Sequence, residues 1–380
     1  MRIAIVGCGY VADFYLHTLG RHPELKLVGI MDRNLTRAQQ FSAYHGIEKI
    51  YPTLDDLIND SEVDIVVNLT NPHSHYEVTK AALGAGKHVY CEKPLAMEFE
   101  HAVELVDLAR EKNLYLSSAP CNVLGEAAQT AWKVLRNNEI GKVFVAYAEM
   151  DDGMIHRTRY RQWISSSGAP WPWKDEFEVG CTMEHAGYYL TWLAAFFGPA
   201  KRITSFSQNL VRDKQTDTPL DKLTSDFSVG VMEFENNIVA RLTCSIIAPH
   251  NRSMHVIGEE GVLTIEDCWD YETNVYKQKT PIGRRIEEWP VVSNLFGVAR
   301  EKVPLVRTTR ANKSDKTMDY FRGVTELAES IQMNRPTRLS ADFSLHITEL
   351  ALAMQYPEKL GTQRELVSTF EGVSPMHWAK

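Results

Sequence analysis

The sequence predicts a two-domain α/β protein in which a doubly wound parallel sheet is followed by a mostly antiparallel sheet. Two observations support this fold class. Up to residue 118, short apolar runs alternate with helical stretches, which is the pattern of a parallel sheet whose connections are helices. After residue 122 the apolar runs lengthen and alternate with polar residues, as in antiparallel strands. A chain of 380 residues is also too long for one compact core.

The first domain, expected at residues 1–121, contains short apolar runs bounded by turn residues, and each run is expected to be a buried strand. The strands are expected at 2–7, 26–31, 64–69, 88–91 and 115–118. The helices are expected at 10–19, 36–44, 53–58, 75–85 and 99–112. His17 and His22 lie in and after the first of these helices, so both are expected at the surface.

The second domain is expected at residues 122–380 and begins with a helix at 126–137. Its strands are expected at 142–150, 202–211, 226–234, 238–246, 254–257 and 262–265. Asn236 and Asn237 are typical of a hairpin turn between two of these strands. Two helices, at 317–333 and 340–354, come last, and the final one is expected to be able to pack back on the first domain.

The composition argues against several classes of function. The net charge of −8 disfavours a protein that binds nucleic acid. No run approaches the roughly 18 apolar residues that cross a bilayer, and the chain starts directly with a strand where a signal peptide would lie. The six cysteines are scattered, and no spacing is typical of a metal site. We therefore expect a cytoplasmic protein with free thiols whose partner is a small molecule.

A glycine-rich turn, Gly7-Cys8-Gly9-Tyr10-Val11-Ala12, lies between the first strand and the first helix and has the pattern G-x-G-x-x-A. The first glycine makes a tight turn, the second lets the backbone approach a pyrophosphate, and Ala12 keeps the helix close to the sheet. The N–H groups and positive dipole end of the helix would then face the phosphates. This context predicts a Rossmann turn that binds a dinucleotide.

Asp32 ends the second strand, 20 residues after Ala12. An acid at this position bonds the ribose hydroxyls of the adenosine and repels a 2′-phosphate, so NAD is favoured over NADP. Arg33 follows directly and weakens this preference, because an arginine can stack on adenine or hold a phosphate. A degenerate Rossmann domain without a cofactor stays open as an alternative.

Three further motifs carry a family resemblance: Thr70-Asn71-Pro72 with His75, Gly86-Lys87-His88-Val89, and Glu92-Lys93-Pro94 after the fourth strand. With the glycine turn, they resemble the Gfo/Idh/MocA family of glucose–fructose oxidoreductase, inositol dehydrogenase and relatives, over nearly the whole chain. The resemblance implies an N-terminal Rossmann domain and a C-terminal open sheet with helices on one face. It also implies a homodimer or homotetramer paired through that sheet, and redox chemistry on sugars, cyclitols or nucleotide sugars.

The resemblance also implies roles for single residues. Lys93 matches the family lysine near the nicotinamide and the reacting hydroxyl, and Lys174 matches a basic residue that contacts substrate. The cofactor-binding residues are expected to be Gly7, Cys8, Gly9, Tyr10, Val11, Asp32, Arg33, Thr70, Asn71, Pro72, His75, Glu92, Lys93, Pro94 and Asn122. The substrate-binding residues are expected to be Lys93, Arg161, Trp163, Trp173, Lys174, Glu184 and Tyr188.

The second signature of the family, D-x-G-x-H-x-x-D, is altered in the stretch 184–191. Glu184 stands for the first acid, Tyr188 for the catalytic histidine and Thr191 for the last acid. A subset of the family carries a similar Tyr-Tyr-Leu-Thr segment, which favours a subgroup over decay. The identity of the proton-transfer partner therefore stays open.

Oxidation of an alcohol sends a hydride to the nicotinamide and needs a nearby acceptor for the hydroxyl proton. Lys93 is the expected acceptor, and desolvation or a neighbouring cation would lower its pKa from about 10.4. Tyr188 is expected as a relay and Glu184 as an orienting acid, while a pocket-shaping tyrosine and a helix-terminal charge stay open as alternatives. His185 is expected to point away from Glu184, as adjacent helical residues do, and to be a bystander, with a role as base open if the signature is aligned in another register.

Residues 156–174 combine three arginines with aromatic residues and precede the altered signature. Aromatic planes stack on sugar rings and arginines hold anionic groups, so this segment is expected to roof a cleft for a sugar derivative, one that could carry an anionic group. A packed loop or an interface is the alternative.

The function favoured by these residues is hydride transfer with NAD on a sugar or cyclitol. A non-redox lyase or glycosidase that retains NAD, and a silent NAD-binding sensor, are the alternatives.

Overall fold

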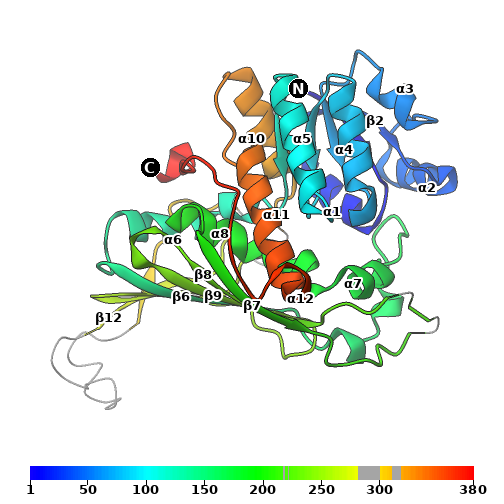
Figure 1. The fold of residues 1–380 in the computed structure, drawn as a ribbon. Coiled ribbons are helices and arrows are strands. Elements are labelled where there is room, and N and C mark those ends of the chain that lie inside the picture. The colour runs from blue at the N-terminus through cyan, green and yellow to red at the C-terminus, as the bar shows by residue number, and fades with distance from the viewer. Residues whose placement is uncertain (217–218, 221, 281–299, 310–317) are drawn as a thin grey trace.

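The computed structural model describes residues 1–216, 219–220, 222–280, 300–309 and 318–380. Two sheets lie one above the other, and helices fill the layer between them (Figure 1). The N-terminus leads directly into the first sheet, and the C-terminal residues lie against the helix at 126–136, where Arg136 donates to the Ala379 carbonyl oxygen. The predicted fold class is confirmed: a parallel, doubly wound sheet precedes a mostly antiparallel one.

Within the described residues, the first sheet has five parallel strands in the order β2-β1-β3-β4-β5. The strands are β1 (Arg2–Val6), β2 (Lys26–Met31), β3 (Ile65–Asn68), β4 (His88–Cys91) and β5 (Leu116–Ser118). The helices are α1 (Tyr10–Leu19), α2 (Leu35–His45), α3 (Leu54–Ile58), α4 (His75–Gly84) and α5 (Phe99–Glu111). The chain reverses its direction of travel across the sheet between β1 and β3, and ligands bind such sheets beyond the carboxyl ends of the strands at this point.

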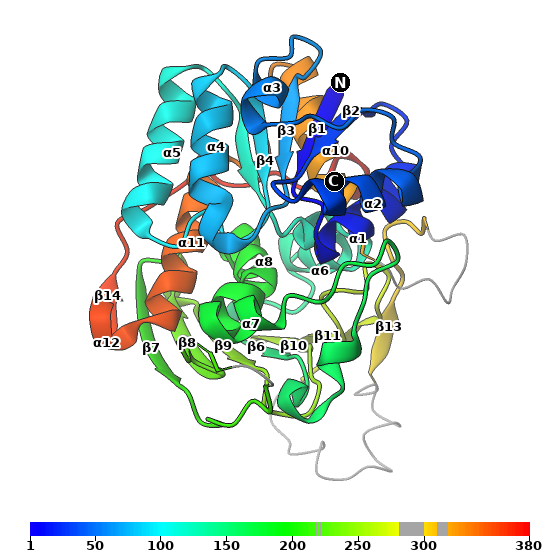
Figure 2. The same cartoon turned by 90° about the vertical axis from the view of Figure 1, so that its right-hand side faces the viewer.

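The two faces of this sheet are covered by different helices, because successive side chains of a strand point to opposite faces. Ile3 and Ile5 pack with α1, α2 and α10 (Phe321–Gln332), whereas Ala4 and Val6 pack with α3, α4 and α5. Helix α10 therefore completes the core of the first sheet although it comes from the C-terminal part of the chain. Helix α11 (Ala341–Gln355) also packs on α5, as Figure 2 shows.

Nine strands of the described chain form the second sheet, in the order β13-β12-β11-β10-β6-β9-β8-β7-β14. Adjacent strands of this sheet run antiparallel, except for the central pair β6 and β9, which is parallel. The strands are β6 (Val143–Asp151), β7 (Arg202–Gln208), β8 (Phe227–Glu233), β9 (Val239–Ser245), β10 (Met254–Gly258), β11 (Gly261–Ile265), β12 (Val275–Lys279), β13 (Glu301–Val303) and β14 (Gln363–Glu365). The last three are short strands near the sheet edges that the sequence pattern did not predict.

Helices α6 (Glu126–Arg136), α8 (Gly187–Phe197) and α11 cover one face of the second sheet. Helix α7 (Trp173–Val179) and a π-helical segment, Thr182–Ala186, precede α8, and α12 (Pro357–Leu360) follows α11. Strand β7 ends three residues before its predicted end. The Asp226 carboxylate accepts hydrogen bonds from the backbone N–H groups of Leu210 and Val211, at 2.8 Å each, and draws this stretch out of the sheet.

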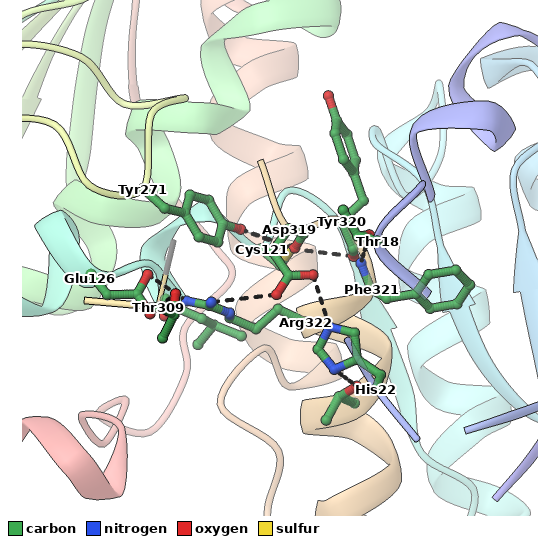
Figure 3. Close-up of polar contacts among 12 residues, drawn as sticks. Thr18, His22, Cys121, Glu126, Tyr271, Thr309, Asp319, Tyr320, Phe321 and Arg322 are labelled. Atoms are coloured by element: carbon green, nitrogen blue, oxygen red, sulfur yellow. Dashed lines mark hydrogen bonds and ion pairs between the residues drawn. The ribbon is translucent and has the colours of Figure 1, made fainter. Parts of the chain in front are cut away.

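The position of His22 corrects the prediction that this residue is exposed. His22 is buried, and its Nε2 lies 2.8 Å from Asp319 Oδ1 while its Nδ1 lies 2.8 Å from Thr325 Oγ1. Figure 3 shows Asp319 between His22 and Arg322, and Arg322 in turn donates to the fully buried Glu126 at 2.8 Å. This network joins the turn after α1 to α10 and α6, and it thereby connects the helices that pack on the two sheets.

In the described ranges, no helix is long and apolar enough to cross a membrane. All six cysteines are buried free thiols.

Candidate active site

A cavity of about 1160 Å³ lies beyond the carboxyl ends of β1 to β4 and is closed on its other side by segments that precede α8. Most of the residues predicted from the sequence line it. They are Gly7, Gly9, Tyr10, Val11, Asp32, Arg33, Thr70, Asn71, Pro72, His75, Glu92, Lys93, Trp163, Glu184 and Tyr188. The glycine turn and the candidate catalytic residues therefore share one continuous space.

The glycine turn has the geometry that a bound dinucleotide needs. Gly7 has φ +98°, and a Cβ there would lie 2.6 Å from the Leu69 carbonyl oxygen, so only glycine fits. A Cβ at Gly9 would meet no protein atom within 4 Å, which leaves the backbone open to a ligand. Helix α1 begins at Tyr10 with no side-chain cap, so the N–H groups of its first turn face the cavity unclaimed by the described side chains.

Asp32 lies at this end of the cavity, where it also fixes the turn. Its Oδ2 accepts a hydrogen bond from the Cys8 N–H at 2.8 Å, and its Oδ1 accepts one from the Asn34 N–H at 2.8 Å. Cys8 itself does not line the cavity, because its side chain is fully buried and burial raises the pKa of the thiol to about 12. Cys8 thus contributes through its backbone.

The loops after β3 and β4 are joined by His75. This buried residue places Nδ1 2.6 Å from the Pro94 carbonyl oxygen and Nε2 3.0 Å from the Thr70 carbonyl oxygen. Burial lowers the pKa of His75, which keeps the ring neutral. Pro94 acts here through its carbonyl and does not line the large cavity. Asn71 Oδ1 is buried without a hydrogen-bond partner in the described residues, so it is free to accept from a ligand.

Lys93 and Glu184 form an ion pair inside the cavity, with 2.5 Å between Nζ and Oε2. Burial alone would lower the pKa of Lys93, but the charges of Glu184 and Glu92 outweigh it and raise that pKa. The expectation of a lowered pKa is therefore wrong for this arrangement, because the neighbours are carboxylates. The same contact holds the pKa of Glu184 below its usual value, despite burial.

The π-helical segment changes the directions of two adjacent side chains. Glu184 and His185 both line the cavity, whereas an α-helix would point them apart, so the prediction that His185 points away from Glu184 is wrong. His185 Nε2 lies 2.9 Å from Glu176 Oε1, and its Nδ1 lies 4.0 Å from Asp152 Oδ2. Burial alone would lower the pKa of His185, but Glu176 and Asp152 together raise it to about 9.

Tyr188 lines the cavity beside Trp269, with 5.1 Å between the ring centroids. Burial raises the pKa of this phenol well above its usual value, so the hydroxyl stays protonated. Asn122 was expected at the cofactor, but it is fully buried and does not line the cavity. Its Nδ2 donates to the backbone carbonyl oxygens of Tyr188, at 3.0 Å, and Cys268, at 3.1 Å, so it supports the wall from behind.

The segment 163–172 covers the cavity with Trp163, Trp171 and the residues 168–170. Three other residues predicted nearby do not line it. Arg161 is exposed and lies over the Tyr160 ring, 6.0 Å from its centroid, and the Trp173 ring lies 6.1 Å from the same ring. Lys174 points along α7, with Nζ 3.7 Å from Glu178 Oε1. Helix α7 begins at Trp173, and the side chains of Trp173 and Lys174 at its start do not line the cavity.

Several lining residues have no signal in the sequence. They are Asp152, Asp175, Glu176, His185, Trp269 and Tyr320. Asp175 and Glu176 lie in α7, His185 lies in the π-helical segment, and Asp152, Trp269 and Tyr320 lie outside helices and strands, so no motif joins them. Together they make this part of the cavity aromatic and acidic.

Comparisons with known proteins agree with this architecture. Residues 1–119 match an oxidoreductase family with an NAD-binding Rossmann fold, and residues 128–264 match the Gfo/Idh/MocA C-terminal domain. The trans-1,2-dihydrobenzene-1,2-diol dehydrogenase of Macaca fascicularis is 26% identical over 273 residues, which are 71% of this chain and 75% of the relative.

Two solved structures share the fold. An oxidoreductase from Agrobacterium radiobacter, crystallised with NAD+, L-tartaric acid and magnesium, superposes with a TM-score of 0.76 at 15% identity, covering 96% of this chain and 98% of that one. The WlbA dehydrogenase from Bordetella pertussis, in complex with NADH and UDP-GlcNAcA, gives 0.73 at 17% identity, covering 97% and 98%. With family matches over both sheets, the chain belongs to the Gfo/Idh/MocA family of oxidoreductases with an NAD-binding Rossmann fold.

Proposed function

We propose that this protein transfers a hydride between a nicotinamide cofactor and a hydroxyl or keto carbon of a sugar, cyclitol or nucleotide-sugar derivative. The observation that carries the proposal is the Lys93–Glu184 ion pair, which lies in the same cavity as the glycine turn. A proton-transfer group and a dinucleotide site in one enclosed space are the two requirements of an alcohol dehydrogenase or carbonyl reductase.

The residues of the cavity fit a dinucleotide. The turn at Gly7 and Gly9 would hold the pyrophosphate, and Asp32 would bond the ribose hydroxyls of the adenosine. We propose NAD over NADP, because a 2′-phosphate would meet the Asp32 carboxylate. Asn71 would hold the nicotinamide end through its unpartnered Oδ1. When bound, the nicotinamide accepts or supplies the hydride.

Lys93 is the proposed proton-transfer residue. In oxidation, the C–H bond breaks and its electron pair leaves with the hydride, while the O–H proton goes to the Lys93 amine. In reduction, the Lys93 ammonium supplies that proton to the carbonyl oxygen. The raised pKa keeps Lys93 protonated at neutral pH, so the resting site is prepared for reduction. Glu184 holds the ammonium in place, and Tyr188 shapes the wall beside it.

A polyhydroxylated and uncharged substrate suits the lining of the cavity. Trp163, Trp171 and Trp269 offer flat apolar surfaces, and Asp152 and Glu176 offer acceptors for hydroxyl groups. Carboxylates repel an anionic group, so we favour a neutral sugar or cyclitol in this part of the cavity. Arg161 and Lys174, which would have held an anion, lie elsewhere.

We also propose that two copies of the chain pair through the open face of the second sheet. Alternate residues of β6 to β9 point away from the covering helices, and three large apolar side chains among them are exposed: Tyr147 (41%), Phe206 (50%) and Val231 (37%). The partner is a second copy, in a homodimer or homotetramer.

The proposed function is tested by following NADH at 340 nm with panels of polyols and keto sugars, in the wild type and in Lys93→Ala. We expect wild-type turnover with at least one panel member and a loss of about 10²- to 10⁴-fold in kcat/KM for the variant, with NADH affinity retained. Unchanged turnover of Lys93→Ala would exclude the assigned role. Net cleavage of a substrate without free NADH would favour a lyase, and NAD binding without any turnover would favour a sensor.

A further inference from the structure

One buried histidine, His185, differs from three others because one of its ring nitrogens has no hydrogen-bond partner. His22, His75 and His346 are buried, and both ring nitrogens of each lie within hydrogen-bond distance of a partner. His185 is also buried, but only its Nε2 has a hydrogen-bond partner, and Nδ1 has none among the described residues. A buried, unpaired ring nitrogen is costly in a residue that serves packing alone.

The position of the His185 side chain adds a second observation. His185 lines the cavity next to Glu184, and the π-helical segment is what brings both side chains to the same side. π-Helical turns inside helices are frequent at functional sites. The unpaired nitrogen thus belongs to a residue that faces the space where the Lys93 ammonium lies, and a ligand in that space is available to it as a partner.

The charged groups around His185 come from several elements. Glu176 of α7 lies at 2.9 Å from Nε2, and Asp152, which follows β6, lies at 4.0 Å from Nδ1. The positive charge of Lys93, which follows β4, lowers the pKa of His185, and Glu184 directly precedes His185 in the chain. Arg252 and His250 do not pair with His185 in the described contacts; both lie near Asp152, at 3.9 Å and 3.8 Å.

We infer that His185 is a second proton-transfer residue of this site, whose Nδ1 exchanges with Lys93, through a bound hydroxyl or water, the proton that the reaction releases or consumes. Glu176 is the positioning residue that holds the ring through Nε2. This inference rests on the proposed function, because it needs a reaction that moves a proton.

The steps balance without a further reactant. In oxidation, the hydride takes its electron pair to the nicotinamide, and the hydroxyl proton passes to Lys93, then to the neutral His185, and from the imidazolium to solvent. In reduction, the protons move in the opposite order. The His185 pKa of about 9 places this group closer to a working pH than Lys93, whose pKa is raised above that of an ordinary lysine. A pKa near the operating pH is the more effective one for proton transfer.

Three variants test the inference on the full-length protein, with the polyol or keto sugar that the panel identifies. His185→Gln removes the titrating group and keeps a polar side chain of similar size. Glu176→Gln keeps a hydrogen-bond acceptor for the ring and removes its charge. Glu178→Gln removes a charge from the same helix but lies outside the cavity, so it is the matched control.

The pH profile of kcat for oxidation is the main readout. Oxidation needs neutral His185, so in the wild type kcat rises with pH toward about 9. In Glu176→Gln the carboxylate that raises the pKa is gone, so the rise moves to lower pH. In His185→Gln the rise near pH 9 is lost, the remaining rise follows Lys93 at higher pH, and kcat falls by about 10²-fold, with KM for NAD little changed. Glu178→Gln keeps the wild-type profile.

The outcomes separate the two proposals. If the wild type turns over and both His185→Gln and Glu176→Gln keep its kcat and pH profile, the inference is wrong and the proposed function stands. If the wild type turns over no member of the panel, the proposed function fails first. Thermal melting and NADH binding show whether His185→Gln folds, and if it does not, the pH shift of Glu176→Gln decides alone.

Discussion

Asp13 of α1 and Ser167 of the segment 163–172 join the helix after the glycine turn to the segment that covers the cavity, with 2.6 Å between Ser167 Oγ and Asp13 Oδ2. Asp13 lies in α1 directly after the glycine turn, and Ser167 lies in the segment that covers the cavity. Arg37 strengthens the connection, because it donates to the Ser167 carbonyl oxygen at 2.7 Å and to the Cys8 carbonyl oxygen at 2.5 Å. The cover is therefore tied to the turn that is proposed to hold the pyrophosphate.

Loss of this connection is expected to speed cofactor release. Ser167→Ala removes hydroxyl contacts to Asp13 and Arg37, and a hydrogen bond to a charged group contributes about 1.5–3 kcal/mol. If the cover opens more often, the Kd of NADH rises by about 10-fold, mainly through a faster off-rate. Stopped-flow fluorescence of bound NADH measures that rate.

Ser166→Ala is the matched control for this experiment. Ser166 is the exposed neighbour of Ser167 in the same segment. The variant is expected to release NADH at the wild-type rate. Equal off-rates for both variants and the wild type would show that the cover does not retain the cofactor.

Asp32 is expected to set the preference for NAD. Asp32→Asn keeps an acceptor for the Cys8 N–H and removes the charge that would repel a 2′-phosphate. We expect the ratio of kcat/KM for NADH over that for NADPH to fall by about 10-fold, a change of roughly 1.4 kcal/mol. Asp55→Asn removes a charge from an exposed position of helix α3 and is expected to leave the ratio unchanged. If Asp32→Asn keeps the wild-type ratio of kcat/KM for NADH over NADPH, other residues set the preference for NAD.

The cofactor half of the site could be predicted because its information is local. The glycine turn, Asp32 and the segment that begins at Glu92 each follow a short buried strand directly. The carboxyl ends of parallel strands meet at one edge of a sheet, so the order of the motifs along the chain already places them together. Their positions in the cavity agree with that rule.

The substrate half could not be predicted in the same way, because its contacts join distant positions. Lys93 and Glu184 are 91 residues apart in the chain. Without knowledge of this carboxylate partner, the pKa of Lys93 is expected to be lowered, whereas the pair raises it. His185 was judged by α-helical geometry, and the π-helical segment replaces that geometry locally. His22 pairs with Asp319, 297 residues away in the chain, and no periodicity in the sequence indicates this contact.

The open face of the second sheet is expected to form the dimer interface. Phe206→Glu replaces the most exposed of the three apolar residues by a charge, which a partner sheet would bury unpaired. We expect this variant to elute as a monomer at a concentration where the wild type is a dimer or tetramer, measured by size exclusion with light scattering. Leu35→Glu alters an exposed apolar residue outside the sheet and is expected to keep the wild-type mass. A monomeric wild type would refute the proposed pairing.

His346 is expected to make the fold sensitive to mild acid. It is fully buried in α11, its Nε2 accepts a hydrogen bond from the Ala200 N–H at 3.0 Å, and its Nδ1 lies 2.9 Å from Ser368 Oγ. A proton on Nε2 would face a donor, so only the neutral ring fits. Burial lowers the pKa of His346 to about 4, against 6.5 for an ordinary histidine.

The sign of the effect follows from this difference. Because the unfolded chain binds the proton more readily, the stabilisation is complete above pH 6.5 and is lost as the pH falls toward about 4. The loss across this window is about 3 kcal/mol, since one pKa unit corresponds to about 1.4 kcal/mol. His346→Gln can make the same hydrogen bonds without titrating, so its free energy of unfolding in urea should fall less between about pH 7 and pH 5. His17→Gln, at an exposed position, should keep the wild-type slope, and an equal slope in His346→Gln would mean that other groups carry the acid sensitivity.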